Sequence, residues 1–195
     1  DTLSLSGTGT ISSADVGTGK TVNTSGLTID NSSGVGSNYT LSAATVNVTE
    51  RVIGLSGVRA FDGTNNASST DLSISNLVSG ENLTLSGSGT VPNATVEMNK
   101  AITLGSLSIS DGSGGKSSNY TLTGGSHTLD ISQLSVNVTG SRQYDGTKTV
   151  NSSDLNLTNL VSGETVSLTG AGTVADENVG ANKTVTSVNL ALTGP

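Results

Sequence analysis

The chain has 195 residues, of which 32% are hydrophobic, 2% aromatic and 12% charged, with 26 glycines, two prolines and no cysteine. Without cysteine it can form neither a disulfide framework nor a thiolate metal site, and a net charge of −7 with scattered basic residues excludes an electrostatic surface for nucleic acid. No apolar run approaches the roughly 20 residues of a membrane-spanning helix, so we expect no membrane insertion.

Short stretches of alternating apolar and polar residues follow one another along the chain, and each predicts a β-strand. Gly-, Asn- and Asp-rich segments separate them and predict turns. No apolar residues recur at helical spacing, so we expect almost no helix. In chain order, the predicted strands lie at 3–11, 20–22, 27–29, 39–41, 46–48, 53–55, 72–78, 83–85, 102–109, 120–122, 129–131 and 136–138.

One hexapeptide organises the chain as a tandem repeat. Residues 142–147 read Arg-Gln-Tyr-Asp-Gly-Thr, and 83 residues earlier the chain reads Arg-Ala-Phe-Asp-Gly-Thr. At the same offset the Asn-Leu-Val-Ser-Gly-Glu segment at 76–81 returns at 159–164, and the beginning of the chain matches at offsets of 80 to 81. The predicted modules are a partial repeat at 1–49, a complete repeat at 50–133 and a partial repeat at 134–195.

Each module contains about seven short strands, with a turn signal every eight to twelve residues, and this pattern is typical of a β-sandwich. The rival is a β-solenoid, which would need a shorter internal period of roughly 20 to 30 residues. We therefore predict an all-β fold, an elongated tandem array of β-sandwich-like repeat modules of about 83 residues, with the solenoid as the alternative.

The aromatic residues occupy two repeat-equivalent positions, because Tyr39 aligns with Tyr120 and Phe61 aligns with Tyr144. An aromatic side chain buries roughly 150–250 Å², so in modules otherwise filled by Val, Leu and Ile we expect all four to anchor the core. The exchange of Phe for Tyr at the second position favours packing. The functional alternative is a platform on which a sugar ring stacks.

An Asp-Gly pair follows one of the two aromatic positions, as Asp62-Gly63 and as Asp145-Gly146. Asp accepts hydrogen bonds from nearby backbone amides and Gly tolerates positive φ, so each pair predicts a tight structural turn. Calcium is the alternative, but an oxygen cage needs several carboxylates at short spacing and each turn has one. We therefore expect no metal and no cofactor.

A catalytic constellation is missing from the sequence. His127 is the sole histidine, and it has neither a cysteine partner nor an equivalent in another repeat. Metal-assisted and Ser-His-Asp chemistry therefore have no basis, and the acids spread over repeated turns are typical of solvated loops. We expect no catalytic residue and no enzymatic activity.

The ordered string of motifs resembles the YDG-type repeats of large secreted bacterial adhesins, the filamentous-haemagglutinin-like exoproteins. The resemblance covers essentially the whole chain, and the middle repeat departs from it with Phe61 and with Pro-Asn-Ala-Thr-Val-Glu at 92–97. The motifs that carry it are Leu-Ser-Val-Asn-Val-Thr-Gly at 134–140, Tyr-Asp-Gly-Thr at 144–147, Leu-Val-Ser-Gly-Glu at 160–164, Leu-Thr-Gly-Ala-Gly-Thr at 168–173, Asn-Val-Gly-Ala-Asn-Lys-Thr-Val at 178–185 and Asn-Tyr-Thr-Leu at 119–122.

The resemblance implies a secreted or cell-surface protein and a structural stalk in a surface or biofilm adhesin, extending a distal binding domain from the cell. Its expected partners are the neighbouring repeats of the same chain, with host or matrix glycans or proteins bound through other domains, and the chain itself is expected to be a monomer. The alternatives are a carbohydrate-binding β-module, and a β-helical passenger or polysaccharide-processing enzyme.

Overall fold

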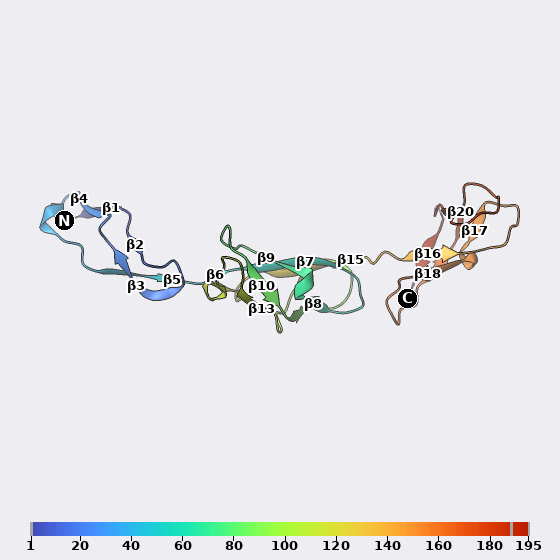
Figure 1. The fold of residues 1–195 in the computed structure, drawn as a ribbon, viewed down its shortest axis with the longest axis horizontal. Helices are drawn as coiled ribbons and strands as arrows, with labels where there is room; N and C mark the ends of the chain where they lie inside the picture. Colours follow the sequence, from blue (N-terminus) through green and yellow to red (C-terminus); the bar gives the residue numbers. More distant parts are fainter. Residues whose placement is uncertain (1, 188, 195) are drawn as a thin grey trace. The chain divides into compact units, whose positions relative to one another are not determined.

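The computed structural model describes residues 2–187 and 189–194, which form an all-β protein (Figure 1). Within these residues the helical segments are 3₁₀ turns of three residues each: η1 (Gly36–Asn38), η2 (Ser69–Asp71), η3 (Ser117–Asn119) and η4 (Ser152–Asp154). The strands are β1 (Leu3–Gly7), β2 (Thr10–Ile11), β3 (Gly17–Asn23), β4 (Leu27–Asn31), β5 (Ala44–Val48), β6 (Arg51–Val52), β7 (Gly54–Ala60), β8 (Asn66–Ser68), β9 (Leu72–Ser75), β10 (Leu83–Ser86), β11 (Ser88–Thr90), β12 (Glu97–Ala101), β13 (Ser108–Asp111), β14 (Tyr120–Thr121), β15 (His127–Ser132), β16 (Asn137–Gly140), β17 (Thr149–Asn151), β18 (Leu155–Thr158), β19 (Ser167–Thr169), β20 (Ala171–Thr173) and β21 (Ala191–Thr193).

The described strands pair into several small open sheets, and most of the pairs are antiparallel. The sheet orders are β1-β4, β2-β3-β5, β6-β14, β12-β15-β7-β9, β8-β11, β10-β13, β16-β18, β17-β20 and β19-β21. A β-solenoid would instead stack parallel strands from coil to coil. The arrangement is therefore sandwich-like, and the predicted all-β class is confirmed.

The repeat seen in the sequence is reproduced in the strand register. Leu55 of β7 pairs with Ile74 of β9, and 83 residues later Val138 of β16 pairs with Leu157 of β18. A one-residue slip would turn every apolar side chain to the opposite face, so equal apolar patterns dictate equal registers. Further equivalent pairs are β8-β11 with β17-β20, and β1-β4 with β10-β13 and β19-β21.

The contacts divide the chain into two compact units, which we number in chain order. Unit 1 contains 1–58, 66–92 and 99–130, and unit 2 contains 59–65, 93–98 and 131–195. No helix among the described residues has the length and apolar character needed to cross a membrane.

The most deeply buried large side chains come from β7 and β15, which are neighbours in the four-stranded sheet: Ile53 (just before β7), Leu55, Leu129 and Ile131 are at most 1% exposed. Their counterparts Val46 in β5 and Val138 in β16 are each 42% exposed. Both β5 and β16 are edge strands with a neighbour on one side only, whereas β7 and β15 each have a neighbouring strand on both sides. The complete repeat therefore holds the best-packed core of the chain.

Candidate functional site

The turn at residues 59–64 is built around the carboxylate of Asp62. The backbone N–H and the Oγ1 hydroxyl of Thr64 donate to Asp62 Oδ1 at 2.8 and 2.9 Å, and Arg59 forms an ion pair with the same oxygen. Gly63 has a φ of 76°, a conformation that glycine adopts at no steric cost. These contacts close the predicted tight turn.

The second Asp-Gly turn repeats this geometry atom by atom. The N–H and hydroxyl of Thr147 each donate to Asp145 Oδ1 at 2.9 Å, Arg142 pairs with the same carboxylate, and Gly146 has a φ of 75°. Arg142 Nη2 also donates to the carbonyl of Thr147 at 2.5 Å, as Arg59 Nη2 does to its own threonine. The turn is thus fixed at both ends by one arginine.

The same hydrogen bonds keep both aspartates ionised. The backbone N–H of Thr147, followed by Arg142, lowers the pKa of Asp145 to about 2. Burial raises the pKa of Asp62, but the two hydrogen bonds from Thr64 and the charge of Arg59 outweigh it, and the net shift is downward. One oxygen of each carboxylate is committed to holding the turn, so these aspartates act as turn supports.

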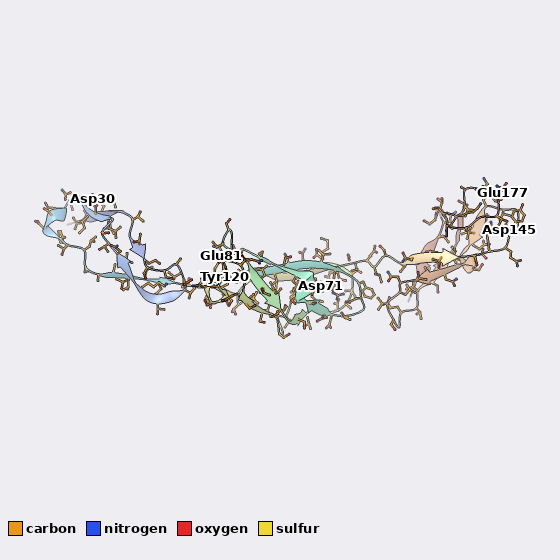
Figure 2. All side chains as sticks on the ribbon, in the orientation of Figure 1. Asp30, Asp71, Glu81, Tyr120, Asp145 and Glu177 are labelled. Atoms are coloured by element: carbon orange, nitrogen blue, oxygen red, sulfur yellow. The ribbon has the colours of Figure 1, made fainter. Side chains whose placement is uncertain are left out.

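Tyr120 is the aromatic side chain that the structure buries, with 4% of its surface exposed. Its hydroxyl donates to Glu81 Oε2 at 2.6 Å and accepts the backbone N–H of Val78 at 3.1 Å; Figure 2 shows Tyr120 and Glu81 together. Burial, followed by the hydrogen bond to Glu81, raises the pKa of the Tyr120 hydroxyl. The segment 78–81 therefore satisfies the polar end of the buried ring.

The other aromatic residues do not share this environment. Tyr39 is 46% exposed, Tyr144 is 64% exposed and Phe61 is half-buried. The expectation of a core anchor is therefore wrong for Tyr39 and Tyr144.

Phe61 and Tyr144 differ in what faces their turns. The Phe61 turn lines a cavity of about 710 Å³ together with the loop at 159–164, and a Cβ atom added at Gly63 would lie 2.7 Å from Val161 Cγ1. At Gly146 an added Cβ would meet only the hydroxyl oxygen of Tyr144, at 3.9 Å. Tyr144 lies instead on the rim of a hollow of about 940 Å³ in unit 2.

A model of the YDG domain matches three consecutive segments of the chain, 1–47, 49–129 and 130–195. The chain belongs to the YDG domain family. Searches of curated proteins and of solved structures found no match. The family assignment covers nearly every residue, and the tripeptide Tyr-Asp-Gly itself stands at 144–146, with Phe-Asp-Gly at 61–63.

A polar contact joins the first and second YDG repeats inside unit 1. Asn119 Oδ1 accepts the backbone N–H of Val16 at 2.9 Å, and Asn119 Nδ2 donates to Asp15 Oδ1 at 2.9 Å. Lys116 Nζ donates to Asp15 Oδ2 at 2.7 Å. The hydrogen bond from Asn119, followed by that from Lys116, lowers the pKa of Asp15 to about 2.

Sequence reasoning missed this contact, which we call the Asn119 joint. The recurring Ser-Asn-Tyr-Thr-Leu motif marked the position of Asn119, but a partner more than 100 residues away leaves no local pattern. We define the joint as Asp15 and Val16 on one side with Lys116 and Asn119 on the other. It ties the first repeat to the second within unit 1.

Metal and catalytic groups have little to build on in the described part of the chain. No group of three or more His, Cys, Asp or Glu side chains among these residues could hold a metal ion. The side chain of His127 is engaged locally, since its Nε2 lies 2.9 Å from the carbonyl oxygen of Leu122. What the arrangement can do chemically is to fix turns and to join repeats.

Proposed function

We propose that this chain is a spacer segment of a large secreted or cell-surface adhesin, in which YDG repeats set the distance between the cell and a distal binding domain. The repeats would contact their neighbours in the same chain, and adhesion targets would be bound by other domains. Such a role needs modules that repeat faithfully and connect end to end, because each added module then adds a fixed increment of length.

One observation carries the proposal: the hydrogen bonds of the Asp62 turn recur without change at Asp145, 83 residues later. The unusual backbone conformations recur with them, each within a few degrees. The equivalent pairs are Gly63 and Gly146 at 76° and 75°, Asn76 and Asn159 at 67° and 66°, Gly80 and Gly163 at 88° and 91°, and Asn99 and Asn182 at 57° and 55°. Faithful repetition of supporting geometry supports a structural role.

Small-angle scattering of the dilute chain tests the spacer. A single globule of this length would have a radius of gyration of about 16 Å by compact-chain scaling. The rise of a β-strand gives each module a length of about 35 Å. Modules of this length placed end to end would form a rod near 80 Å, with a radius of gyration above about 22 Å. A monomer measured at about 16 to 18 Å would remove the physical basis of the proposal.

A carbohydrate-binding module is the second candidate, and the exposure of Tyr144 beside the hollow in unit 2 favours it. A flat aromatic ring beside a hollow that has both polar and apolar lining can stack on a sugar. A glycan array separates the two functions: a spacer gives no hits, whereas a sugar-binding module gives hits that Tyr144→Ala abolishes. Tyr39→Ala, which alters the other exposed tyrosine, is the matched control.

A further inference from the structure

The same two-residue irregularity stands at equivalent places in all three repeats. A residue in the left-handed conformation precedes a lysine, as Gly19-Lys20, Asn99-Lys100 and Asn182-Lys183, and the first residue of each pair has a φ of 60°, 57° and 55°. Strands have negative φ, so a left-handed residue interrupts them, and asparagine is one of the few residues besides glycine that adopts this conformation readily. In the first two repeats the irregularity lies within β3 and β12. It is therefore a built-in feature of the repeat.

In the first repeat the irregularity is a β-bulge. Just before Lys20, strand β3 has one residue more than its partner β5, which lies beside it in Figure 1. The N–H of Gly19 donates to Asn47 Oδ1 of β5 at 2.8 Å. In the middle repeat the N–H of Asn99 donates to Asp130 Oδ1 of β15 at 2.6 Å. In both repeats, therefore, the amide at the bulge is directed to a side chain of the partner strand.

The lysine that follows the bulge is turned into the repeat. Lys100 is only 4% exposed, an unusual burial for a charged residue. In the other two copies the ammonium group reaches a backbone carbonyl seven residues earlier. Lys20 Nζ donates to the carbonyl of Ser13 at 3.0 Å, and Lys183 Nζ donates to the carbonyl of Asp176 at 3.1 Å. Lys20 itself is half-buried, so water still reaches its side chain.

The bulge and its lysine lie on an edge of the sheet. β2 pairs with Val22 and Asn23 of β3, and among the described residues the segment 17–21 of β3 has β5 as its only neighbouring strand, although the second repeat is present. In the middle repeat, β12 is an outer strand of the four-stranded sheet. An edge strand offers unpaired N–H and C=O groups to any strand that fits, and neighbouring repeats with equal apolar patterns supply such strands.

We propose that the bulge and its lysine close this edge to other strands, so that equal repeats in one chain fold without exchanging or adding strands. The bulge breaks the regular row of backbone groups with which a new strand would pair. An added strand would also exclude water from Lys20, whose ammonium group has three N–H donors and would keep the carbonyl of Ser13. The inference does not rest on the spacer function, because any chain of equal tandem repeats is exposed to such exchange.

Refolding from urea at micromolar concentrations, followed by size-exclusion chromatography with light scattering, tests the proposal. The parent chain should return as a monomer. Lys100→Met removes the inward charge and nearly keeps the length of the side chain, so part of the refolded protein should shift to dimers and larger species. Hydrogen exchange at 97–101 should be slower in these species than in the monomer, because a second strand then pairs with β12. Asn99→Gly should refold like the parent, since Gly19 occupies this position in the first repeat.

Two control variants separate the edge from charge and from stability. Lys148→Met removes the same charge from an exposed lysine that also donates to a backbone carbonyl, and Ile131→Val loosens the core in β15 without altering the edge. Both should refold as monomers. If Lys100→Met does not fold, Lys20→Met replaces it, with hydrogen exchange followed at 17–21.

Three results would each overturn the proposal. The first is a Lys-to-Met variant that refolds as a monomer like the parent. The second is association of the two control variants to the same extent as the Lys-to-Met variant. The third is a dimer in which the edge segment exchanges its amide hydrogens as fast as it does in the monomer.

Discussion

The contrast between Tyr120 and Tyr39 gives the sharpest test of how the complete repeat is stabilised. Both tyrosines stand in a Ser-Asn-Tyr-Thr-Leu motif, but Tyr120 is 4% exposed and Tyr39 is 46% exposed. Emptying a buried aromatic site costs about 3 to 5 kcal/mol, so Tyr120→Ala should lower the free energy of unfolding of its repeat by that amount. Tyr39→Ala should cost about 0.5 kcal/mol or less, as an exposed substitution does.

Tyr120→Phe divides this cost between the ring and the hydroxyl. It keeps the packing but removes the hydroxyl that donates to Glu81 and accepts the N–H of Val78. A hydrogen bond to a charged group contributes about 1.5–3 kcal/mol, and a part-buried amide left unpaired costs about 1–3 kcal/mol. Since Glu81 is only half-buried and regains water when released, we expect a net loss of about 2 kcal/mol for Tyr120→Phe.

The assay should report on the complete repeat alone, because the chain contains two compact units. Urea unfolding followed by far-UV circular dichroism gives the overall transition, and hydrogen exchange at the amides of Leu55 and Leu129 gives the local free energy. Both residues are at most 1% exposed, so their amides exchange only when this core opens. Equal losses for Tyr39→Ala and Tyr120→Ala, or no loss for Tyr120→Phe, would refute the reasoning.

Three further predictions concern the turns and metal binding. The carboxyl of Asp145 should titrate in NMR near its lowered pKa of about 2. The stability that it contributes is therefore present above its ordinary pKa of 3.8 and is lost as the pH falls to about 2. Arg142→Ala should raise the pKa of Asp145, and an unchanged titration would show that the ion pair has no effect. Gly63→Ala should destabilise unit 2 more than Gly80→Ala destabilises unit 1. Both glycines have positive φ, but only a Cβ at Gly63 would collide with another side chain, that of Val161. Equal losses of unfolding free energy in chemical denaturation would mean that the loop containing Val161 moves to accommodate the Cβ. EDTA should leave the melting temperature unchanged, since no described cluster suits a metal, and a drop of more than about 10 °C in calorimetry would reveal a bound ion.

The repeat, the fold class and the Asp-Gly turns could be predicted from sequence because their causes are local. Alternating side chains determine which face of a strand is apolar, and an Asp followed by Gly can close a turn without help from distant residues. The turns at Asp62 and Asp145 have the predicted conformation, with equal hydrogen bonds. The 3₁₀ turns are short enough to agree with the expected scarcity of helix.

The burial of the aromatic residues and the Asn119 joint could not be predicted, because both depend on distant segments. Tyr39 and Tyr120 stand in the same sequence motif, but Tyr120 is buried and its hydroxyl hydrogen-bonds to Val78 and Glu81, about 40 residues away. Likewise the half-buried Phe61 and the exposed Tyr144 have equal turns, and the loop at 159–164 distinguishes them. A local motif therefore specifies conformation, whereas its burial depends on which other repeat segments accompany it.

The pairing of β7 with β15 has a mechanical consequence. Leu55 N–H donates to the carbonyl of Ser126 and Phe61 N–H donates to the carbonyl of Ser132, so both partners advance by six residues and the strands are parallel. The complete repeat begins near β7 and ends at β15, and tension on its two ends pulls these strands in opposite directions along their length. Such a force loads the hydrogen bonds of the pair together in shear, because they lie across the direction of pull. A chain under flow would therefore unfold this repeat slowly, as the rate of forced unfolding depends on rupture of the whole strand pair at once.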